Sequence, residues 1–389
     1  MRLRVCFFFL LISQISFAQN CDVDQIKELL QNQQYSLVYS MADALQECSD
    51  INDSDVEWAK FHQSICALEL FNDEAQFRLE QYLENYPLGE YSRQAYLALA
   101  KLHFRNKEYD KVIAKLSNIN VYDLEFHEEA MYYFRLGYSY FSLNKYEEAK
   151  LAFFDIKSVA FTYSELTTYC LSHMAYEEGN YATALQGFQR LISTPTLGII
   201  SKYYITHIFY YQERYNELID FAKPLLENSY NPKRDKELKR LIGDAYFALS
   251  QYQNSIDYLE DYMSDDASGS LDRIEKYQLG LAYFELQDYS KATAQFEDVL
   301  LDEDSLAQFA AHQLGQCYLL LDEKPLAINA FKYASAINFD YTLKEDAAFN
   351  SVKLIYEEQS SYDNAVESIE QFIEDYPQSV HIDYVQDLL

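Results

Sequence analysis

The sequence predicts an all-α protein, a solenoid of about nine to ten helical hairpins. Glycine and proline are scarce, with 9 Gly and 6 Pro among 389 residues, which disfavours the many tight turns of a β-sandwich or barrel. One spacing of small and apolar residues recurs in steps of 34 to 38 residues, the length of one helical hairpin. Hydrophobic residues make up 49% of the chain, enough for a continuous core.

The first 18 residues are predicted to be a secretory signal peptide. Arg2 and Arg4 form a basic start, an apolar run extends from Val5 to Ile12, and the segment ends at the small residue Ala18. This run is too short to span a membrane, and no later segment offers about 18 uninterrupted apolar residues. We therefore expect cleavage near Ala18, export to the periplasm or cell envelope, and no membrane span.

The formal net charge is −31, from 62 acidic and 31 basic residues. Such a chain repels nucleic acid and anionic lipid headgroups, which removes both from the expected partners.

Residues 19–54 are predicted to form a capping hairpin at the start of the array. Cys21 and Cys48 would meet at its open end, either as a disulfide or as two free thiols. Cys66, Cys170 and Cys317 fall on first helices and are interpreted as small core residues. No CxxC pair occurs, so we expect neither a redox module nor a zinc site.

The repeat is clearest around four glycines. A tyrosine follows each glycine after three residues, a small residue after twelve, and a large apolar residue after sixteen. The four are Gly137, Gly243, Gly280 and Gly315. Weaker copies place Gln63, Ala100, Ser172, Thr206 and Lys353 at the same position. Because a glycine inside a helix costs about 1 kcal/mol relative to alanine, its recurrence indicates a close approach of two paired helices.

This spacing resembles the tetratricopeptide repeat, in which the glycine is the eighth residue. The resemblance implies a right-handed superhelix, here a continuous array over 55–378. Residues 379–389 match the beginning of a further first helix, so that we expect either a capping helix or a chain cut from a longer protein. The Tyr-Pro pairs at Tyr86-Pro87 and Tyr376-Pro377 resemble those of cell-envelope members of the family.

The resemblance also implies a binding surface, because these proteins bind partners along a concave wall of first helices at the fifth, ninth and twelfth positions. The predicted contact residues are Phe134, Tyr138, Phe141, Tyr169, His173, Tyr176, Tyr203, His207, Tyr210, Arg240, Tyr277 and Phe284, with Asp244, Phe247 and Leu281 in the same register. At the twelfth position an aromatic residue also serves packing, which stays open as the alternative. Tyrosine suits recognition of a protein or peptide segment, or of an envelope glycan.

Two charged features have competing interpretations. His173 and His207 fall in one register on adjacent hairpins, yet no third ligand accompanies them, and we expect a solvated or hydrogen-bonded pair rather than a metal site. The run Lys233, Arg234, Lys236, Lys239 and Arg240 is either a site for an acidic partner or an ordinary solvated helix face.

No enzyme motif is found, and we expect no catalytic residue and no cofactor. Glu367-Ser368 resembles the acid of lytic transglycosylases, but it lies within a repeat helix and is interpreted as solvent-facing. The predicted function is a non-catalytic protein–protein interaction scaffold of the bacterial cell envelope. The alternatives are the substrate-guiding part of a larger envelope enzyme acting on peptidoglycan or polysaccharide, and a glycan-binding module.

Overall fold

The computed structural model describes residues 22–46, 48, 51–156, 162–227, 231–264, 273–358 and 362–389. Within these ranges all regular structure is helical, which confirms the predicted all-α helical repeat. The predicted signal peptide lies outside them, as does Cys21. Cys48 is disulfide-bonded, whereas Cys66, Cys170 and Cys317 are free and buried. The Cys21–Cys48 pair therefore stays a prediction.

The chain forms two compact units, residues 1–191 and 192–389, and each is described by itself. The helices of unit 1 are α1 (Val23–Gln31), α2 (Tyr35–Leu45), α3 (Asp53–Glu69), α4 (Ala75–Asn85), α5 (Ser92–Arg105), α6 (Tyr109–Leu116), α7 (Phe126–Ser142), α8 (Tyr146–Phe154), α9 (Ser164–Glu177) and α10 (Tyr181–Leu191), with a short 3₁₀ helix, η1 (Val121–Asp123). The predicted domain limits at residues 18, 54 and 378 stay predictions.

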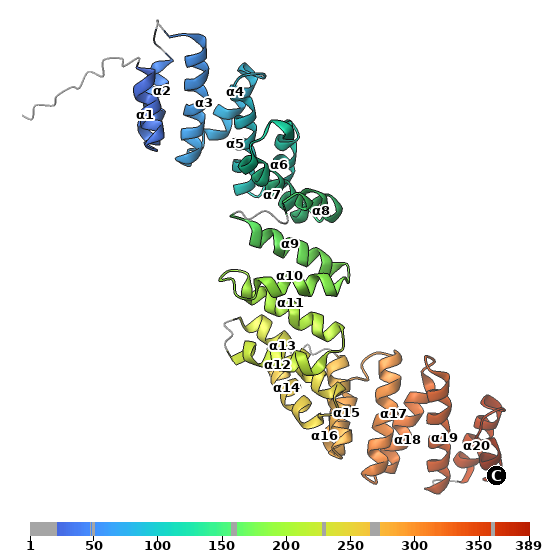
Figure 1. Ribbon diagram of the computed structural model, residues 1–389. Helices are drawn as coiled ribbons and strands as arrows, with labels where there is room; N and C mark the ends of the chain where they lie inside the picture. The colour runs from blue at the N-terminus through green and yellow to red at the C-terminus, as the bar shows by residue number, and fades with distance from the viewer. Residues whose placement is uncertain are drawn as a thin grey trace, which may run out of the picture. The chain divides into compact units, whose positions relative to one another are not determined.

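The helices of unit 2 are α11 (Gly198–Tyr211), α12 (Tyr215–Glu227), α13 (Pro232–Ala248), α14 (Tyr252–Ser264), α15 (Arg273–Glu285), α16 (Tyr289–Glu297), α17 (Ser305–Leu320), α18 (Lys324–Ala336), α19 (Tyr341–Glu357), α20 (Tyr362–Asp375) and α21 (Ile382–Gln386). In both units each helix packs on the next one, and the first helices of neighbouring hairpins also touch, as α7 does with α9 and α17 with α19. Figure 1 shows this side-by-side stacking for α17 to α20, in orange and red. The described residues thus form ten hairpins followed by α21.

The repeat glycines lie where the two helices of a hairpin cross, as predicted. A Cβ on Gly137 would lie 2.6 Å from Phe153 Cε1, and one on Gly315 would lie 2.7 Å from Phe331 Cε1. Real Cβ atoms do not approach a ring so closely, so each glycine makes room for the large residue sixteen positions later. The same holds for Gly243, whose Cβ would lie 2.8 Å from Leu259 Cδ2.

The turns inside the hairpins share one conformation that needs a positive φ. After α7, Asn144 has φ +58°, and Lys145 N–H donates to Tyr140 O at 2.9 Å, as in a Schellman motif. The residues with positive φ at these turns are Gln33, Phe71, Lys107, Asn144, Gly179, Glu213, Ser250, Gln287 and Asp322. Glycine fills one of these nine positions, which explains how the chain makes its turns with so few glycines.

The predicted register of the last complete hairpin is wrong by one residue in its first helix. Lys353, assigned to the helix crossing, has a side chain that is 44% exposed. Val352 is buried instead and packs in one cluster with Ile369 and Phe372 of α20. Four residues separate α19 from α20, whereas three separate α7 from α8 and α15 from α16. One additional residue between these two helices matches the one-residue difference in register.

The tyrosine three residues after the glycine joins neighbouring hairpins. Tyr283 donates its hydroxyl to Glu260 on α14, and Tyr318 donates to Glu297 on α16. Tyr246, at the same position, accepts from Lys223 Nζ on α12 at 3.2 Å. These bonds each run back to the second helix of the preceding hairpin, so the repeat tyrosine ties consecutive hairpins together. Among the described ranges, none of the helices combines the length and apolar character that a bilayer crossing needs.

Candidate functional site

The candidate site is the face that the first helices of each unit present at the fifth, ninth and twelfth repeat positions, which we call the first-helix face. In unit 1 it carries an aromatic series on α7 and α9. The Tyr138 ring lies 6.1 Å from that of Phe141, and Phe141 lies 5.4 Å from the His173 ring, edge to face. His173 in turn lies 6.0 Å from Tyr169. The structure therefore brings together these four predicted residues.

His173 is half-buried within this series. Burial lowers the pKa of His173, while the nearby Glu177 carboxylate, 3.7 Å from Nε2, opposes the shift. The imidazole is therefore held mainly neutral near pH 7, with a polar nitrogen among aromatic rings.

Phe134 holds the fifth position of α7, but its side chain is not exposed on this face. Its side chain is 1% exposed, and its ring stacks on Tyr163 with centroids 4.4 Å apart and planes 7° from parallel. The structure places it in the core shared by α7, α8 and α9. A partner cannot reach this ring, so the assignment of Phe134 as a contact residue is wrong.

The aromatic residues at the twelfth position have a recurring packing role. Phe141 lies 5.9 Å from Tyr146, Tyr176 lies 5.9 Å from Tyr181, and Phe284 lies 5.6 Å from Tyr289. In each case the partner is the tyrosine that begins the second helix of the same hairpin. The packing interpretation of the twelfth position thus explains these three rings without a ligand.

In unit 2 the first-helix face begins with Tyr203 and His207 on α11, whose rings lie 4.4 Å apart. The guanidinium of Arg234 lies 5.9 Å from the Tyr203 ring centre. Burial lowers the pKa of His207, and the charge of Glu237 acts in the opposite direction. His207 is therefore a half-buried imidazole beside an electron-rich ring and is mainly neutral near pH 7.

The centre of the unit 2 face is a charged cluster around Arg240 on α13. Arg240 donates from Nη2 to Glu237 Oε1 at 2.8 Å and from Nη1 to Asp244 Oδ2 at 2.9 Å. Glu275 Oε1 on α15 lies 3.9 Å from Nη1, and Tyr210 on α11 donates its hydroxyl to Asp244 Oδ2 at 3.2 Å. The cluster thus joins the first helices of three consecutive hairpins.

Asp244 is an unusual member of this cluster because it is only 8% exposed. Burial raises the pKa of Asp244, and the Arg240 charge only partly offsets this. Its Oδ1 atom is buried and accepts no hydrogen bond within the described part of the chain. The carboxylate is therefore incompletely compensated.

Tyr277 and Leu281 on α15 continue the face. The Tyr277 ring lies 5.7 Å from Phe296, and burial raises the pKa of Tyr277. Phe247 and Leu281 are half-buried in the same apolar cluster.

Glu237 and Glu275 belong to the site although the sequence prediction omitted them. Glu237 could have been found, because it lies three residues before Arg240 on one helix face. Glu275 could not, because its contact with Arg240 links two hairpins.

The two histidines proposed as a pair lie in different units, His173 in unit 1 and His207 in unit 2. A search of the described residues finds no group of three or more His, Cys, Asp or Glu side chains arranged to hold a metal ion.

The basic run on α13 does not form one patch. Lys233, Lys236 and Lys239 line a cavity of about 790 Å³ together with Asp235 and Asp261. Lys239 pairs with Asp261 at 2.9 Å. Arg234 and Arg240 instead lie beside the rings of the first-helix face. The helix thus separates the five cations into two sets.

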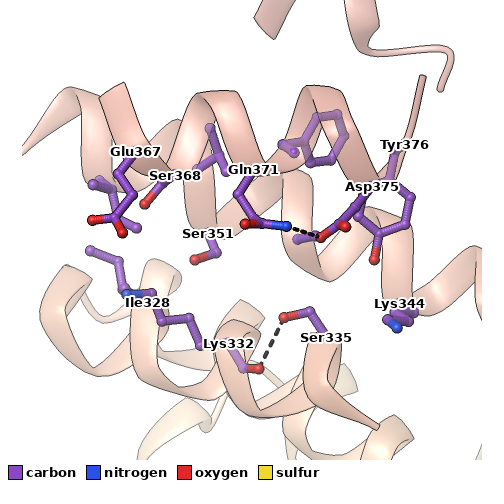
Figure 2. A pocket seen from close by; sticks show the side chains of 14 residues that line it. Ile328, Lys332, Ser335, Lys344, Ser351, Glu367, Ser368, Gln371, Asp375 and Tyr376 are labelled. Atoms are coloured by element: carbon purple, nitrogen blue, oxygen red, sulfur yellow. Dashed lines mark hydrogen bonds between the residues drawn. The ribbon is translucent and has the colours of Figure 1, made fainter. Parts of the chain in front are cut away.

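A groove of about 620 Å³ runs between α18 and α20 over α19 (Figure 2). Figure 2 shows Glu367 and Ser368 on α20 on the opposite side of the groove from Lys332 on α18. Val352 and Phe372 line it among other apolar side chains. Glu367 is exposed, in agreement with its interpretation as a solvent-facing residue.

Two family models match the chain, both described as tetratricopeptide repeat, over residues 130–153 and 347–379. The chain carries tetratricopeptide repeats. The first match covers Gly137 and Phe153, whose close approach defines the hairpin crossing, and the second covers most of α19 and all of α20. Repeats of this family bind proteins or peptides. The matches therefore support a role of this tetratricopeptide-repeat chain as a protein-interaction scaffold, without naming its partner.

Among solved structures, the chain is similar to YrrB, titled a TPR protein with an unusual peptide-binding site, at 17% identity and a TM-score of 0.41, over 47% of this chain and 91% of that one. It is also similar to the C-terminal part of a TPR repeat-containing protein from Cytophaga hutchinsonii, at 16% identity and a TM-score of 0.42, over 69% and 97% of the two chains. The P58(IPK) TPR domain matches at 15% identity and a TM-score of 0.30, over 87% and 100%. At these TM-scores we draw no conclusion from them. A search of curated proteins finds no match.

Proposed function

We propose that this tetratricopeptide-repeat chain is an exported, non-catalytic scaffold of the bacterial cell envelope that holds a segment of a partner protein against its first-helix faces. The observation that carries the proposal is the continuation of half-buried aromatic side chains along consecutive first helices. Tyr138 and Tyr169 represent the series in unit 1, and Tyr203 and Tyr277 represent it in unit 2.

The chemistry of these tyrosines supports recognition. The hydroxyls of Tyr203 and Tyr277 make no hydrogen bond to any described residue, although their rings are packed. A rigid apolar ring with an available hydroxyl can bury apolar surface of a peptide and also bond its backbone. Such side chains lose little conformational entropy on binding, because their neighbours already hold the rings.

The binding proposal is tested with a triple variant, Tyr169→Ala, Tyr203→Ala and Tyr277→Ala. Proteins that co-purify with the wild-type chain from envelope extracts are identified by mass spectrometry and then tested against the variant. We expect their recovery to fall at least tenfold while the circular dichroism spectrum stays helical. A control variant changes three exposed tyrosines away from these positions, Tyr122, Tyr341 and Tyr384, to alanine. Equal recovery with both variants contradicts the proposal.

The export proposal rests on residues 1–18 and is tested separately. The full chain, expressed in a bacterium with a periplasm, should be recovered from that compartment with an N-terminus near Gln19. Deletion of residues 2–18 should retain it in the cytoplasm. Periplasmic recovery of the deleted chain, or cytoplasmic recovery of the full chain, contradicts export by this segment.

A further inference from the structure

The charges around the unit 2 first-helix face indicate the chemical class of partner that it binds. This inference rests on the proposed function. Three carboxylates, Glu237, Asp244 and Glu275, surround the single guanidinium of Arg240 at 2.8 to 3.9 Å. With Arg234 beside Tyr203, the part of the face on α11, α13 and α15 has two guanidinium groups and three carboxylates in this cluster, and His207 is mainly neutral. The net charge of this cluster of side chains is therefore negative.

Arg240, which lies at the middle of the carboxylate cluster, is not available to an acidic partner. Arg240 uses Nε and Nη2 on Glu237 and Nη1 on Asp244, and its guanidinium lies 5.9 Å from the Tyr210 ring centre. An acidic segment would have to displace these carboxylates before it could reach Arg240. It would also approach a chain of formal net charge −31, which slows encounter with any anion.

The same side chains favour the binding of a basic segment. The Glu237 side chain is 31% exposed, so one carboxylate of the cluster is open to solvent. Asp244 has a buried oxygen without a hydrogen bond, so additional positive charge nearby would stabilise its ionised form. The contacts of Arg234 with Tyr203 and of Arg240 with Tyr210 show that tyrosine rings of this face accept guanidinium groups.

We infer that the unit 2 first-helix face binds a basic peptide segment, with an arginine or lysine side chain placed at Glu237 near the Tyr203 ring. The carboxylates supply the charge selectivity, and the tyrosines supply the apolar contact area. At low salt the acidic composition of the whole chain accelerates its encounter with a basic peptide. At physiological ionic strength, charges more than about 8 Å from the peptide contribute little to this attraction.

The test uses three labelled peptides of equal length with leucine at alternate positions and arginine, glutamine or glutamate between them. Binding to the full chain is followed by fluorescence anisotropy at 0.15 M salt. We expect the arginine peptide to bind at least tenfold more tightly than the glutamine peptide and the glutamate peptide to bind most weakly. Failure of the arginine peptide to bind, or equal binding of the arginine and glutamate peptides, overturns the inference.

Matched variants separate local recognition from general attraction. Glu237→Gln should weaken the arginine peptide about tenfold and leave the glutamine peptide unchanged. Glu370→Gln removes the same formal charge from an exposed residue of α20 and should change the affinity less than twofold. If the two variants weaken the arginine peptide equally, only the overall charge acts, and the inference is wrong.

A third variant distinguishes failure of this inference from failure of the proposed function. Tyr203→Ala with Tyr277→Ala should weaken both the arginine and the glutamine peptides. If it does so while Glu237→Gln has no effect, the face binds peptides without selecting charge, and only the charge inference fails. If the tyrosine changes affect no peptide that binds, peptide recognition by this face fails as well.

Discussion

A Cβ atom placed on Gly280 would lie 2.6 Å from Cε1 of Phe296, sixteen residues later on the facing helix. Phe296 is fully buried in the core of unit 2, so its ring has no free space to move into. We expect Gly280→Ala to destabilise the fold by about 1–3 kcal/mol, although alanine is the better helix former. Urea unfolding followed by circular dichroism measures the change.

The control for this prediction is a double-mutant cycle. In a Phe296→Ala background the added methyl group of Gly280→Ala has space, and its cost should disappear. An equal cost of Gly280→Ala in both backgrounds would show that the contact with Phe296 is not the cause.

The hydrogen bond from Tyr283 to Glu260 predicts an effect of mutation. Tyr283→Phe keeps the ring and removes the donor, and because Glu260 is exposed and can bind water instead, we expect a loss of about 0.5–1.5 kcal/mol. Denaturant titration at pH 7 measures it. Tyr122→Phe, at a residue that is 97% exposed, serves as the control and should change nothing.

The raised pKa of Tyr283 predicts that the stability of the fold decreases at alkaline pH. Burial, and then the bond to Glu260, raise the pKa of Tyr283 above its ordinary 10.0, so the folded state favours the protonated phenol. The stabilisation is complete below pH 10.0 and is lost as the pH rises towards the pKa of the folded state. The wild type should therefore lose more stability above pH 10 than Tyr283→Phe does; parallel curves would disagree with this assignment.

The lowered pKa of His207 predicts that the stability of the fold decreases at acidic pH. Burial lowers the pKa of His207 below 6.5, and Arg240 acts in the same direction while Glu237 opposes it. The unfolded chain therefore binds the proton more readily, and stability falls as the pH decreases below 6.5. His207→Gln should reduce the difference in unfolding free energy between pH 7.5 and pH 5.5. His173 and His62 shift in the same direction, so a smaller dependence should persist in the variant. An unchanged difference would contradict the role of His207.

The hairpin turns predict a stabilising substitution. Glu213 has φ +56°, and Arg214 N–H donates to Phe209 O at 2.9 Å. Glycine adopts this conformation without strain, but it also has more conformational freedom in the unfolded chain, which partly offsets the gain. The net effect of Glu213→Gly should be a stabilisation of the fold by about 0.5–1 kcal/mol. The reverse change, Gly179→Ala at φ +73°, should destabilise by about 1 kcal/mol. Thermal unfolding of both variants checks the sign, and two changes of the same sign would refute the explanation.

The amino-acid sequence by itself determined the helices, the hairpins and the close approach within each hairpin. Helix periodicity is local, and a glycine such as Gly137 can be recognised as a crossing residue from its fixed spacing to Phe153. The tyrosine that follows each glycine could also be identified, although its bond to the preceding hairpin could not.

Only the tertiary structure decided which residues of the predicted binding surface a partner can reach. Phe134 shares the register of Tyr169 and Tyr203, yet it is buried against Tyr163, because burial depends on side chains from other helices. Lys353 was misplaced because the length of a turn is independent of the helix period. The cluster of Glu237, Arg240 and Glu275 likewise joins two hairpins, and contacts between hairpins depend on how the helices pack rather than on spacing along the chain.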